Sequence, residues 1–155
     1  MQPVTYEDLT IRPYEHGSSD DQKGYILRHK VLALSPAVSD GTLDFIFKSH
    51  DDEVDYIKIG VFTEEGMVGT LCLVPQAGDA AMIKQFAVSQ KLQGTGIGRK
   101  LLEYAHDAAR ELGYKRVVLD ARENVVGFYA KAGYILAGEK RVYTKITLVP
   151  MYIDL

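Results

Sequence analysis

Three glycines alternate in Gln93-Gly94-Thr95-Gly96-Ile97-Gly98, between an apolar run that ends at Val88 and a long helical pattern. Glycine inside a helix costs roughly 1 kcal/mol relative to alanine, so three glycines at a helix start need a chemical reason. The first amides of a helix have no intrahelical acceptor, and glycine lets an anion come close to them. The segment therefore predicts a turn that binds phosphate through its backbone, with Arg99 adding positive charge.

Known phosphate-binding patterns differ in where their glycines fall. A P-loop needs Gly-Lys followed by Ser or Thr, which this turn lacks. The dinucleotide fingerprint needs Gly or Ala where this chain has Arg99, counted from Gly94, or Leu101, counted from Gly96. The remaining pattern, Q/R-x-x-G-x-G/A, is matched at every fixed position from Gln93. A nucleotide-binding regulatory domain stays only as a remote alternative.

A second segment, Asn124-Val125-Val126-Gly127-Phe128-Tyr129-Ala130-Lys131-Ala132-Gly133-Tyr134, begins 30 residues after Gly94. It is similar to a segment of the form N-x-x-[AG]-x-x-[FY]-Y-x-K-x-G-[FY], shortened before the aromatic pair. In this order and spacing, the two segments resemble the GNAT superfamily of acetyl-coenzyme A-dependent N-acetyltransferases. The resemblance is strongest from about Ala81 to Gly138.

The resemblance implies acetyl-coenzyme A as co-substrate and a role for each matching position. The backbone of Phe86, Ala87 and Val88 would pair with the pantetheine arm. Asn124 and Phe128 would contact that arm from the other side, and Tyr129 would lie near the thioester sulfur as the catalytic residue. The residues that would hold the pyrophosphate are Gln93, Gly94, Thr95, Gly96, Ile97, Gly98 and Arg99.

Acetyl transfer to an amine also calls for a group that takes up the amine's proton. An unperturbed phenol has a pKa of about 10, so Tyr129 stays protonated at neutral pH and suits the leaving thiolate instead. Many family members have a carboxylate on the strand that leads into the turn, whereas this chain has Lys84 and Gln85 and no Asp or Glu there. Glu123, Asp120 and the acidic segment 51–55 are open as alternatives, and no base is assigned.

The elements that must position these residues follow from hydrophobic periodicity. Apolar spacing predicts helices from Ser18 to before Pro36 and over 94–112. Asn124 is predicted to cap a short helix that ends near Gly133. Segment 35–53 is predicted as a loop or short helix. Strands are expected over 4–14, 56–63, 67–74, 80–88, 116–120, 134–138 and 146–154. The expected class is α/β: one central mixed, mostly antiparallel sheet with a parallel βαβ crossover at its centre, flanked by helices.

Length and composition limit the number of domains and the classes of function that this chain can have. The 155 residues predict a single domain over 1–155, and 18 basic against 21 acidic residues give a formal net charge of −3. An acidic balance argues against non-specific nucleic-acid binding. One cysteine, Cys72, excludes an internal disulfide and a multi-cysteine zinc site. No signal peptide or membrane-length apolar run is visible, so a cytoplasmic location is expected.

Several other polar residues have a structural interpretation. The histidines His16, His29, His50 and His106 share no metal-ligand spacing, and no metal is expected. His106 falls on the polar side of its helix and is predicted to be solvated. Cys72 is predicted to be a small buried side chain. The run Asp51-Asp52-Glu53 is predicted to be a solvated loop, with a rim that attracts an amine as the alternative.

These expectations combine into an N-acetyltransferase in which a primary amine attacks acetyl-coenzyme A directly within a ternary complex. The amine can belong to a small molecule or a protein. A catalytically inactive acyl-coenzyme A-binding or sensing module of the same fold is the alternative, and a longer acyl group is also open. The protein is expected to be a monomer or a homodimer, since the apolar strand 146–153 offers an edge for pairing.

Overall fold

The computed structural model describes residues 1–32 and 50–155, without the side chains of His50 and Asp51. The helix end predicted before Pro36 and most of the loop or short helix predicted over 35–53 therefore lie outside the described residues. The described end of that segment belongs to a 3-10 helix. Within the described part, no helix is long and apolar enough to cross a membrane.

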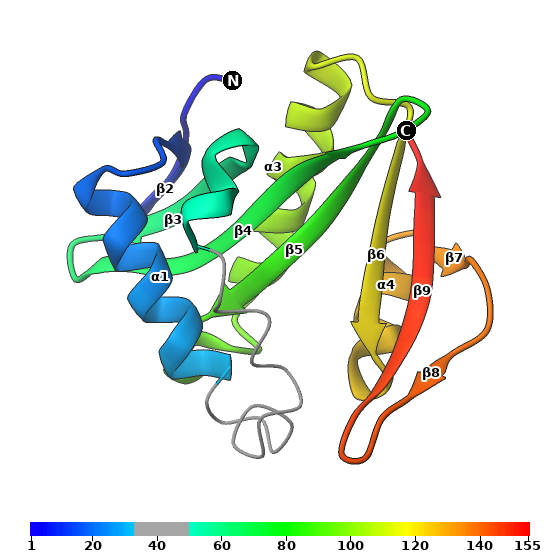
Figure 1. Cartoon of the computed structure of the whole chain (residues 1–155). Coiled ribbons are helices and arrows are strands. Elements are labelled where there is room, and N and C mark those ends of the chain that lie inside the picture. Colours follow the sequence, from blue (N-terminus) through cyan, green and yellow to red (C-terminus); the bar gives the residue numbers. More distant parts are fainter. Residues whose placement is uncertain (33–49) are drawn as a thin grey trace.

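One sheet organises the described chain, in the order β1-β2-β3-β4-β5-β6-β9-β7, with β8 also beside β9 (Figure 1). Every neighbouring pair is antiparallel except β5 and β6, which are parallel. This confirms the predicted mixed α/β class. The strands are β1 (Val4–Tyr6), β2 (Leu9–Tyr14), β3 (Ile57–Thr63), β4 (Gly66–Gln76), β5 (Ala80–Val88), β6 (Arg116–Arg122), β7 (Ile135–Leu136), β8 (Arg141–Val142) and β9 (Thr147–Asp154).

Helices cover both faces of the sheet. The α-helices are α1 (Ser19–Leu32), α3 (Ile97–Glu111) and α4 (Val126–Lys131), and the 3-10 helices are η2 (His50–Asp55), η3 (Gln90–Leu92) and η4 (Glu123–Val125). Helix α1 lies on one face, and α3 lies on the other (Figure 1). The predicted stripe on α3 is buried from Ile97 through Ala108, whereas Leu112, just beyond the helix, is 48% exposed.

The parallel pair β5–β6 opens into a gap. Only Ala80–Met82 pairs with Arg116–Val118, although β5 continues to Val88 and β6 to Arg122. A register shift in the β4–β5 pair accompanies a positive φ of 57° at Gln85, which marks a bulge in β5. Strand β5 pairs with β4 on its other side, and β6 pairs with β9 on its other side. Beyond their short paired region, β5 and β6 separate toward their carboxyl ends (Figure 1).

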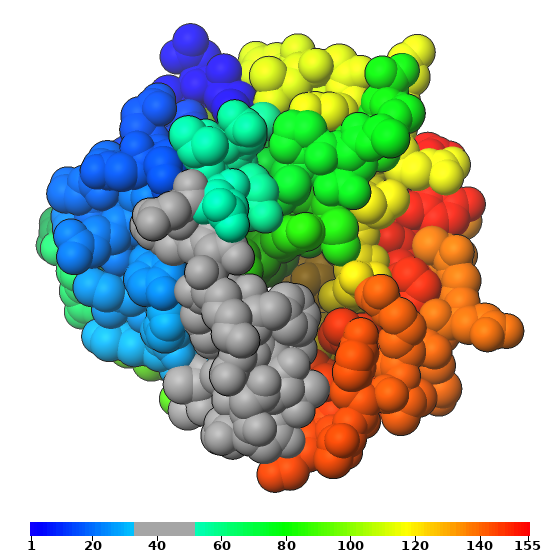
Figure 2. All heavy atoms as spheres, viewed as in Figure 1, coloured from blue at the N-terminus to red at the C-terminus, as the bar shows by residue number. Residues whose placement is uncertain are grey.

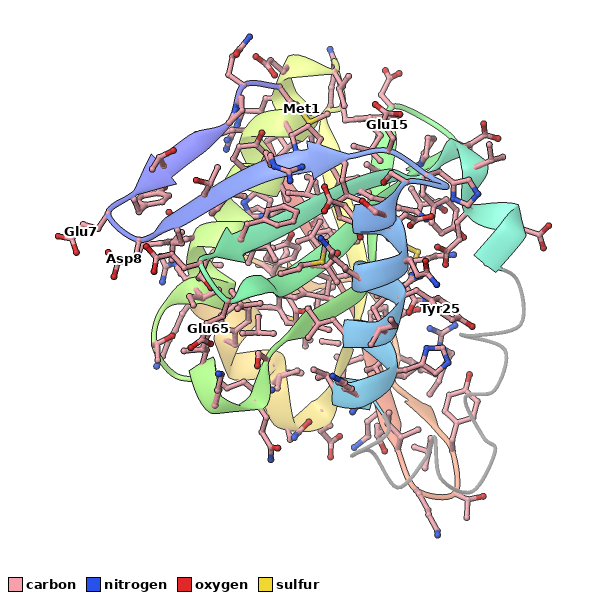
Figure 3. All side chains as sticks on the ribbon, turned by 90° about the vertical axis from the view of Figure 1, so that its left-hand side faces the viewer. Met1, Glu7, Asp8, Glu15, Tyr25 and Glu65 are labelled. Carbon is pink, nitrogen blue, oxygen red and sulfur yellow. The ribbon has the colours of Figure 1, made fainter. Side chains whose placement is uncertain are left out.

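Two sequence predictions at the ends of the chain need correction. The predicted strand 4–14 is a hairpin, because the chain turns at Glu7 and Asp8, where Glu7 has a φ of 33° (Figure 3). The last strand, β9, was expected to offer a pairing edge, but it lies between β6 on one side and β7 and β8 on the other. Strand β8, which is only two residues long, was not predicted.

Candidate active site

A cavity of about 1160 Å³ occupies the region where β5 and β6 separate. Figure 2 shows a hollow on this face of the molecule, bordered by green, yellow and orange atoms. The predicted site residues that line it are Phe86, Ala87, Val88, Gln93, Gly94, Gly96, Gly98, Arg99, Asn124, Phe128 and Tyr129. Thr95 and Ile97 do not line it, because the Thr95 hydroxyl donates to the carbonyl of Leu92 and the Ile97 side chain is buried in the core.

The glycine turn leaves backbone amides available at the cavity. Gly94 and Gly96 have φ values of 82° and 89°, in the left-handed region that favours glycine. Helix α3 starts at Ile97, and Lys100 is the first residue of the helix whose amide bonds back, to the carbonyl of Gly96 at 3.1 Å. Among the described residues, no backbone carbonyl accepts from the amides of 96–99. Four adjacent amides at a helix start are the donor set that a phosphate group needs.

Contacts within the chain hold this turn against the sheet. The Gln93 side-chain amide donates to the carbonyl of Val88 at 3.1 Å, and the amide of Ser89 donates to the carbonyl of Val68 at 2.8 Å. Gln93, predicted to bind coenzyme, thus also ties the turn to the end of β5. A Cβ at Gly94 or Gly96 would meet no atom within 4 Å, so backbone conformation, not crowding, requires glycine there.

Tyr129 lies on α4, within a group of aromatic rings. Its ring centroid is 5.1 Å from that of Phe128, 5.6 Å from that of Tyr134 and 6.4 Å from that of Phe86. Burial raises the pKa of Tyr129 to about 12, although the positive charge of Arg122 acts in the opposite direction. The phenol is therefore protonated at neutral pH, and its hydroxyl has no hydrogen-bond partner among the described residues.

His106 lies behind this aromatic group, and the prediction that it is solvated is wrong. It is 7% exposed, and its Nε2 is 2.7 Å from the hydroxyl oxygen of Tyr134. Burial lowers the pKa of His106 to about 4, so the ring is neutral at pH 7. The helical period could have indicated this burial. Residues 102, 105, 106 and 109 share one helix face, and the three besides His106 are apolar.

Asn124 was predicted to cap the short helix and to contact the coenzyme arm. The structure shows no side-chain cap on either η4 or α4, whose N-cap positions are Arg122 and Val125. Asn124 is exposed and lines the cavity instead. The capping prediction is therefore wrong, and the amide side chain is left available at the cavity.

Comparison with known proteins decides the family. A family model described as an acetyltransferase (GNAT) domain matches residues 55–155. The chain belongs to the GNAT acetyltransferases. The resemblance seen in the sequence is therefore confirmed.

Two relatives by sequence are also acetyltransferases. A glucosamine 6-phosphate N-acetyltransferase of Arabidopsis thaliana is 27% identical over 136 residues, which cover 82% of this chain and 90% of that protein. A streptothricin acetyltransferase of Escherichia coli is 30% identical over 105 residues, covering 66% of this chain and 60% of that protein.

Solved structures share the GNAT fold at lower identity. A candidate N-acetyltransferase from Lactobacillus plantarum has a TM-score of 0.82 at 19% identity, covering 96% of this chain and 99% of that one. A GNAT family acetyltransferase from Elizabethkingia anophelis, solved with acetyl-coenzyme A bound, has a TM-score of 0.69 at 19% identity, covering 97% and 100%. At these identities the likeness establishes the fold alone.

The candidate bases of this GNAT acetyltransferase are mostly occupied by ion pairs. Asp120 lines the cavity and is paired with Arg141 of β8. Glu123 is exposed, and its carboxylate is 3.2 Å from the ammonium nitrogen of Lys140. In the acidic segment, Asp52 and Asp55 are exposed and do not line the cavity, and the side chain of Asp51 lies outside the described residues.

Glu53 belongs to a buried charge cluster, which we define as Asp21, Arg28, Glu53 and Lys58. The Arg28 guanidinium donates to both Glu53 carboxylate oxygens, each at 3.0 Å. The Lys58 ammonium nitrogen lies 2.6 Å from Asp21 Oδ1 and 3.0 Å from Glu53 Oε1. Burial alone would raise the pKa of Glu53, but hydrogen bonds from Arg28 and Lys58 hold it below its ordinary value. Glu53 is therefore ionised and not a solvated loop residue as predicted.

The cluster also corrects the predicted face of the first helix. Of its apolar residues only Leu27 is buried, and Ile26 is 47% exposed. Asp21 and Arg28 are buried instead, where Lys58 of β3 neutralises Asp21 and Glu53 of η2 neutralises Arg28. The cluster joins α1, η2 and β3, and thereby supports the cavity wall at Glu53 and Tyr56.

Cys72 and possible metal ligands are the other groups that could carry chemistry. Cys72 is buried as predicted, and burial raises the pKa of its thiol to about 12. A thiol that is protonated and buried is a poor nucleophile. Among residues 1–32 and 50–155, no group of three or more His, Cys, Asp or Glu side chains is arranged to hold a metal ion.

Proposed function

We propose that this protein transfers an acetyl group from acetyl-coenzyme A to a primary amine, by direct attack within a ternary complex. One observation carries the proposal: the amides of 96–99 and the protonated hydroxyl of Tyr129, none of which has a hydrogen-bond partner among residues 1–32 and 50–155, belong to one cavity. The amides suit the pyrophosphate and the hydroxyl suits the leaving sulfur. The acetyl-coenzyme A held by a GNAT structure of the same fold supports this co-substrate.

Strand β5 supplies the binding surface for the pantetheine arm. Beyond Met82, its side that faces β6 pairs with no described strand, so the backbone of 86–88 can bond the amides of the arm. Asn124 and Phe128 line the opposite side of the cavity, and both are free to contact the arm. Residues 96–99 bind the pyrophosphate through their amides.

Tyr129 acts on the leaving group. The amine nitrogen forms a bond to the thioester carbonyl carbon, the carbon–sulfur bond breaks, and the sulfur leaves with the electron pair. Tyr129, with a pKa of about 12, donates a hydrogen bond to the developing thiolate. A thiol has a pKa of about 8.5, so this phenol stabilises the thiolate without giving up its proton. The proton that the amine loses balances the one that the thiolate finally takes up.

The acceptor is a small-molecule amine or a protein amine. The sequence relatives are named for glucosamine 6-phosphate and for streptothricin, and a structural neighbour is a ribosomal-protein-S18-alanine N-acetyltransferase from Escherichia coli. Relatives with such different names leave the acceptor of this chain open between the two classes. A cytoplasmic location, and a monomer or homodimer, stay predictions from the sequence.

A catalytically inactive acyl-coenzyme A-binding module is a second candidate, and one observation favours it. The two cavity carboxylates, Glu53 and Asp120, are both ion-paired, and β5 has no carboxylate of its own. Such a module would bind acetyl-coenzyme A without consuming it.

Binding and turnover separate the two candidates. A ligand at 100 times its dissociation constant stabilises the folded state by about 2.7 kcal/mol, which raises the melting temperature by roughly 5–10 °C at this size. We expect such a shift with acetyl-coenzyme A and with coenzyme A, and none with ATP or NAD. Release of free thiol in the presence of an amine panel would then support the enzyme. Binding without release would favour the module, and the absence of any coenzyme A shift would contradict both.

A further inference from the structure

Most charges at the cavity are already neutralised by the protein. The charged side chains among the described lining residues are Glu53, Lys84, Arg99, Asp120 and Arg122. Glu53 pairs with Arg28 and Lys58, Arg99 pairs with Glu103, and Asp120 pairs with Arg141. Lys84 and Arg122 are the two charged lining residues that have no ion-pair partner among the described residues.

Lys84 and Arg122 form no ion pair or side-chain hydrogen bond with any described residue. Both are half-buried. Burial lowers the pKa of Arg122, because the charged guanidinium is partly removed from water. A charge in such a position is unfavourable unless something compensates it, and a group of this kind in a cleft is a candidate for ligand binding.

The position of Lys84 separates it from the coenzyme phosphates. Lys84 lies four residues before the end of β5, at most about 13 Å of strand at roughly 3.3 Å per residue. The glycine turn begins only after that end. Arg122 ends β6 and is close enough to Tyr129 for its charge to act on the pKa of the phenol. Lys84 therefore lies away from the glycine turn and Arg122 lies near Tyr129, on the two strands that separate around the cavity.

Lys84 also lies on the sheet face covered by α1. It pairs in register with Cys72, whose sulfur is 3.9 Å from the Arg28 guanidinium of α1. The glycine turn instead leads into α3, which covers the opposite face (Figure 1). A coenzyme bound at the turn would leave the charge of Lys84 for a second ligand on the α1 side.

We propose that the acceptor amine carries an anionic oxyacid group, a carboxylate or a phosphate, which Lys84 and Arg122 bind together. This inference rests on the proposed function, because it concerns the second substrate of that reaction. The planar fork of Arg122 matches two oxygens of either group, and Lys84 adds a point charge from the other strand. The amine of the acceptor is then directed toward the thioester end, near Tyr129.

Matched pairs of amines test the inference. The pairs are O-phosphoethanolamine and ethanolamine, β-alanine and β-alaninamide, and tyramine phosphate and tyramine. Binding to the protein saturated with coenzyme A is measured by calorimetry, and kcat/KM is measured with acetyl-coenzyme A. We expect the anionic member of at least one pair to bind about 10- to 100-fold more tightly, the range for charge-assisted hydrogen bonds, with the advantage shrinking as salt is added. The phosphate and carboxylate pairs show which oxyacid the site prefers.

Variants show whether these two residues carry the selectivity. Lys84→Met and Arg122→Met keep the apolar stem, and each should bring the ratio between anionic and neutral partners close to one. Lys115→Met makes the same charge change at an exposed residue beyond the other end of β6 and should keep the wild-type ratio.

Each outcome decides between the proposals. Equal binding of both members in every pair would overturn the anionic acceptor. Variants of Lys84 and Arg122 that weaken the binding of both members equally would also overturn it. Selective binding of an anionic amine without acetylation of any amine would uphold the anion site and contradict the proposed enzyme.

Discussion

The glycine turn and the buried charge cluster both gather polar groups, but they satisfy them in opposite ways. At the turn, the amides of 96–99 have no backbone acceptor among the described residues. In the cluster, Glu53 receives two hydrogen bonds from Arg28, and Lys58 lies between Asp21 and Glu53. Donors without acceptors are typical of a surface that binds a ligand, whereas buried charges held in ion pairs are typical of a support for the fold.

The largest effect is expected from breaking the cluster. Glu53→Leu leaves Arg28 with no carboxylate partner and removes one partner of Lys58 in a buried region. Removal of one partner from a buried pair destabilises a protein by about 3–5 kcal/mol. Urea unfolding of Glu53→Leu should show this loss, while Asp52→Leu, an exposed change on the same η2 helix, should show little.

The double variant Arg28→Met, Glu53→Leu removes both charges of the pair. It should recover part of the stability that Glu53→Leu loses, because no uncompensated guanidinium is left. If the double variant is less stable than Glu53→Leu, the pair is not the source of the effect.

The next effect concerns catalysis. Tyr129→Phe removes the hydroxyl that has no partner among the described residues, while the ring contacts with Phe128 and Tyr134 are kept. Loss of one transition-state hydrogen-bond donor lowers kcat by about 10²- to 10³-fold. Steady-state kinetics should show this fall with little change in the melting temperature. Tyr143→Phe, which changes an exposed tyrosine, is the control, and an unchanged kcat in Tyr129→Phe would exclude the leaving-group role.

A smaller effect is expected at the turn itself. Gly96→Ala places a Cβ at a φ of 89°, which costs about 1–2 kcal/mol and shifts the amides from their present directions. Calorimetry should show coenzyme A binding weakened by about 10-fold or more. Gly66→Ala brings similar strain at a φ of 111° in the β3–β4 hairpin, and should cost stability without changing coenzyme A affinity. Equal affinities of the two variants would deny the turn its phosphate role.

The sequence predicted the helix start after the glycine turn and most strand positions, because both depend on local rules. Alternating glycines at a helix start and apolar periods are visible within a few residues, and the structure bears out α3, β5 and β6 with small shifts of boundary. The buried charge cluster depends on residues far apart in the chain, since Arg28 and Glu53 are 25 residues apart. Helix α1 buries Asp21 and Arg28, and charged residues are usually expected on the solvent-exposed face of a helix. The sequence of α1 alone therefore predicted the wrong buried face.

The prediction that His106 is solvated was wrong although the period of its own helix indicated a buried position, and the pH dependence of stability tests that burial. Burial lowers its folded-state pKa to about 4, against about 6.5 in an unfolded chain. Below pH 6.5 the unfolded state takes up the proton first, so stability falls as pH drops from about 6.5 toward 4, by up to about 1.4 kcal/mol per pH unit. His106→Gln should lose this slope in unfolding curves measured between pH 6.5 and 5. Tyr134→Phe should keep the slope despite losing the 2.7 Å hydrogen bond, because burial is the main cause of the shift. Parallel stability curves for the wild type and His106→Gln would mean that His106 is not held neutral behind Tyr134.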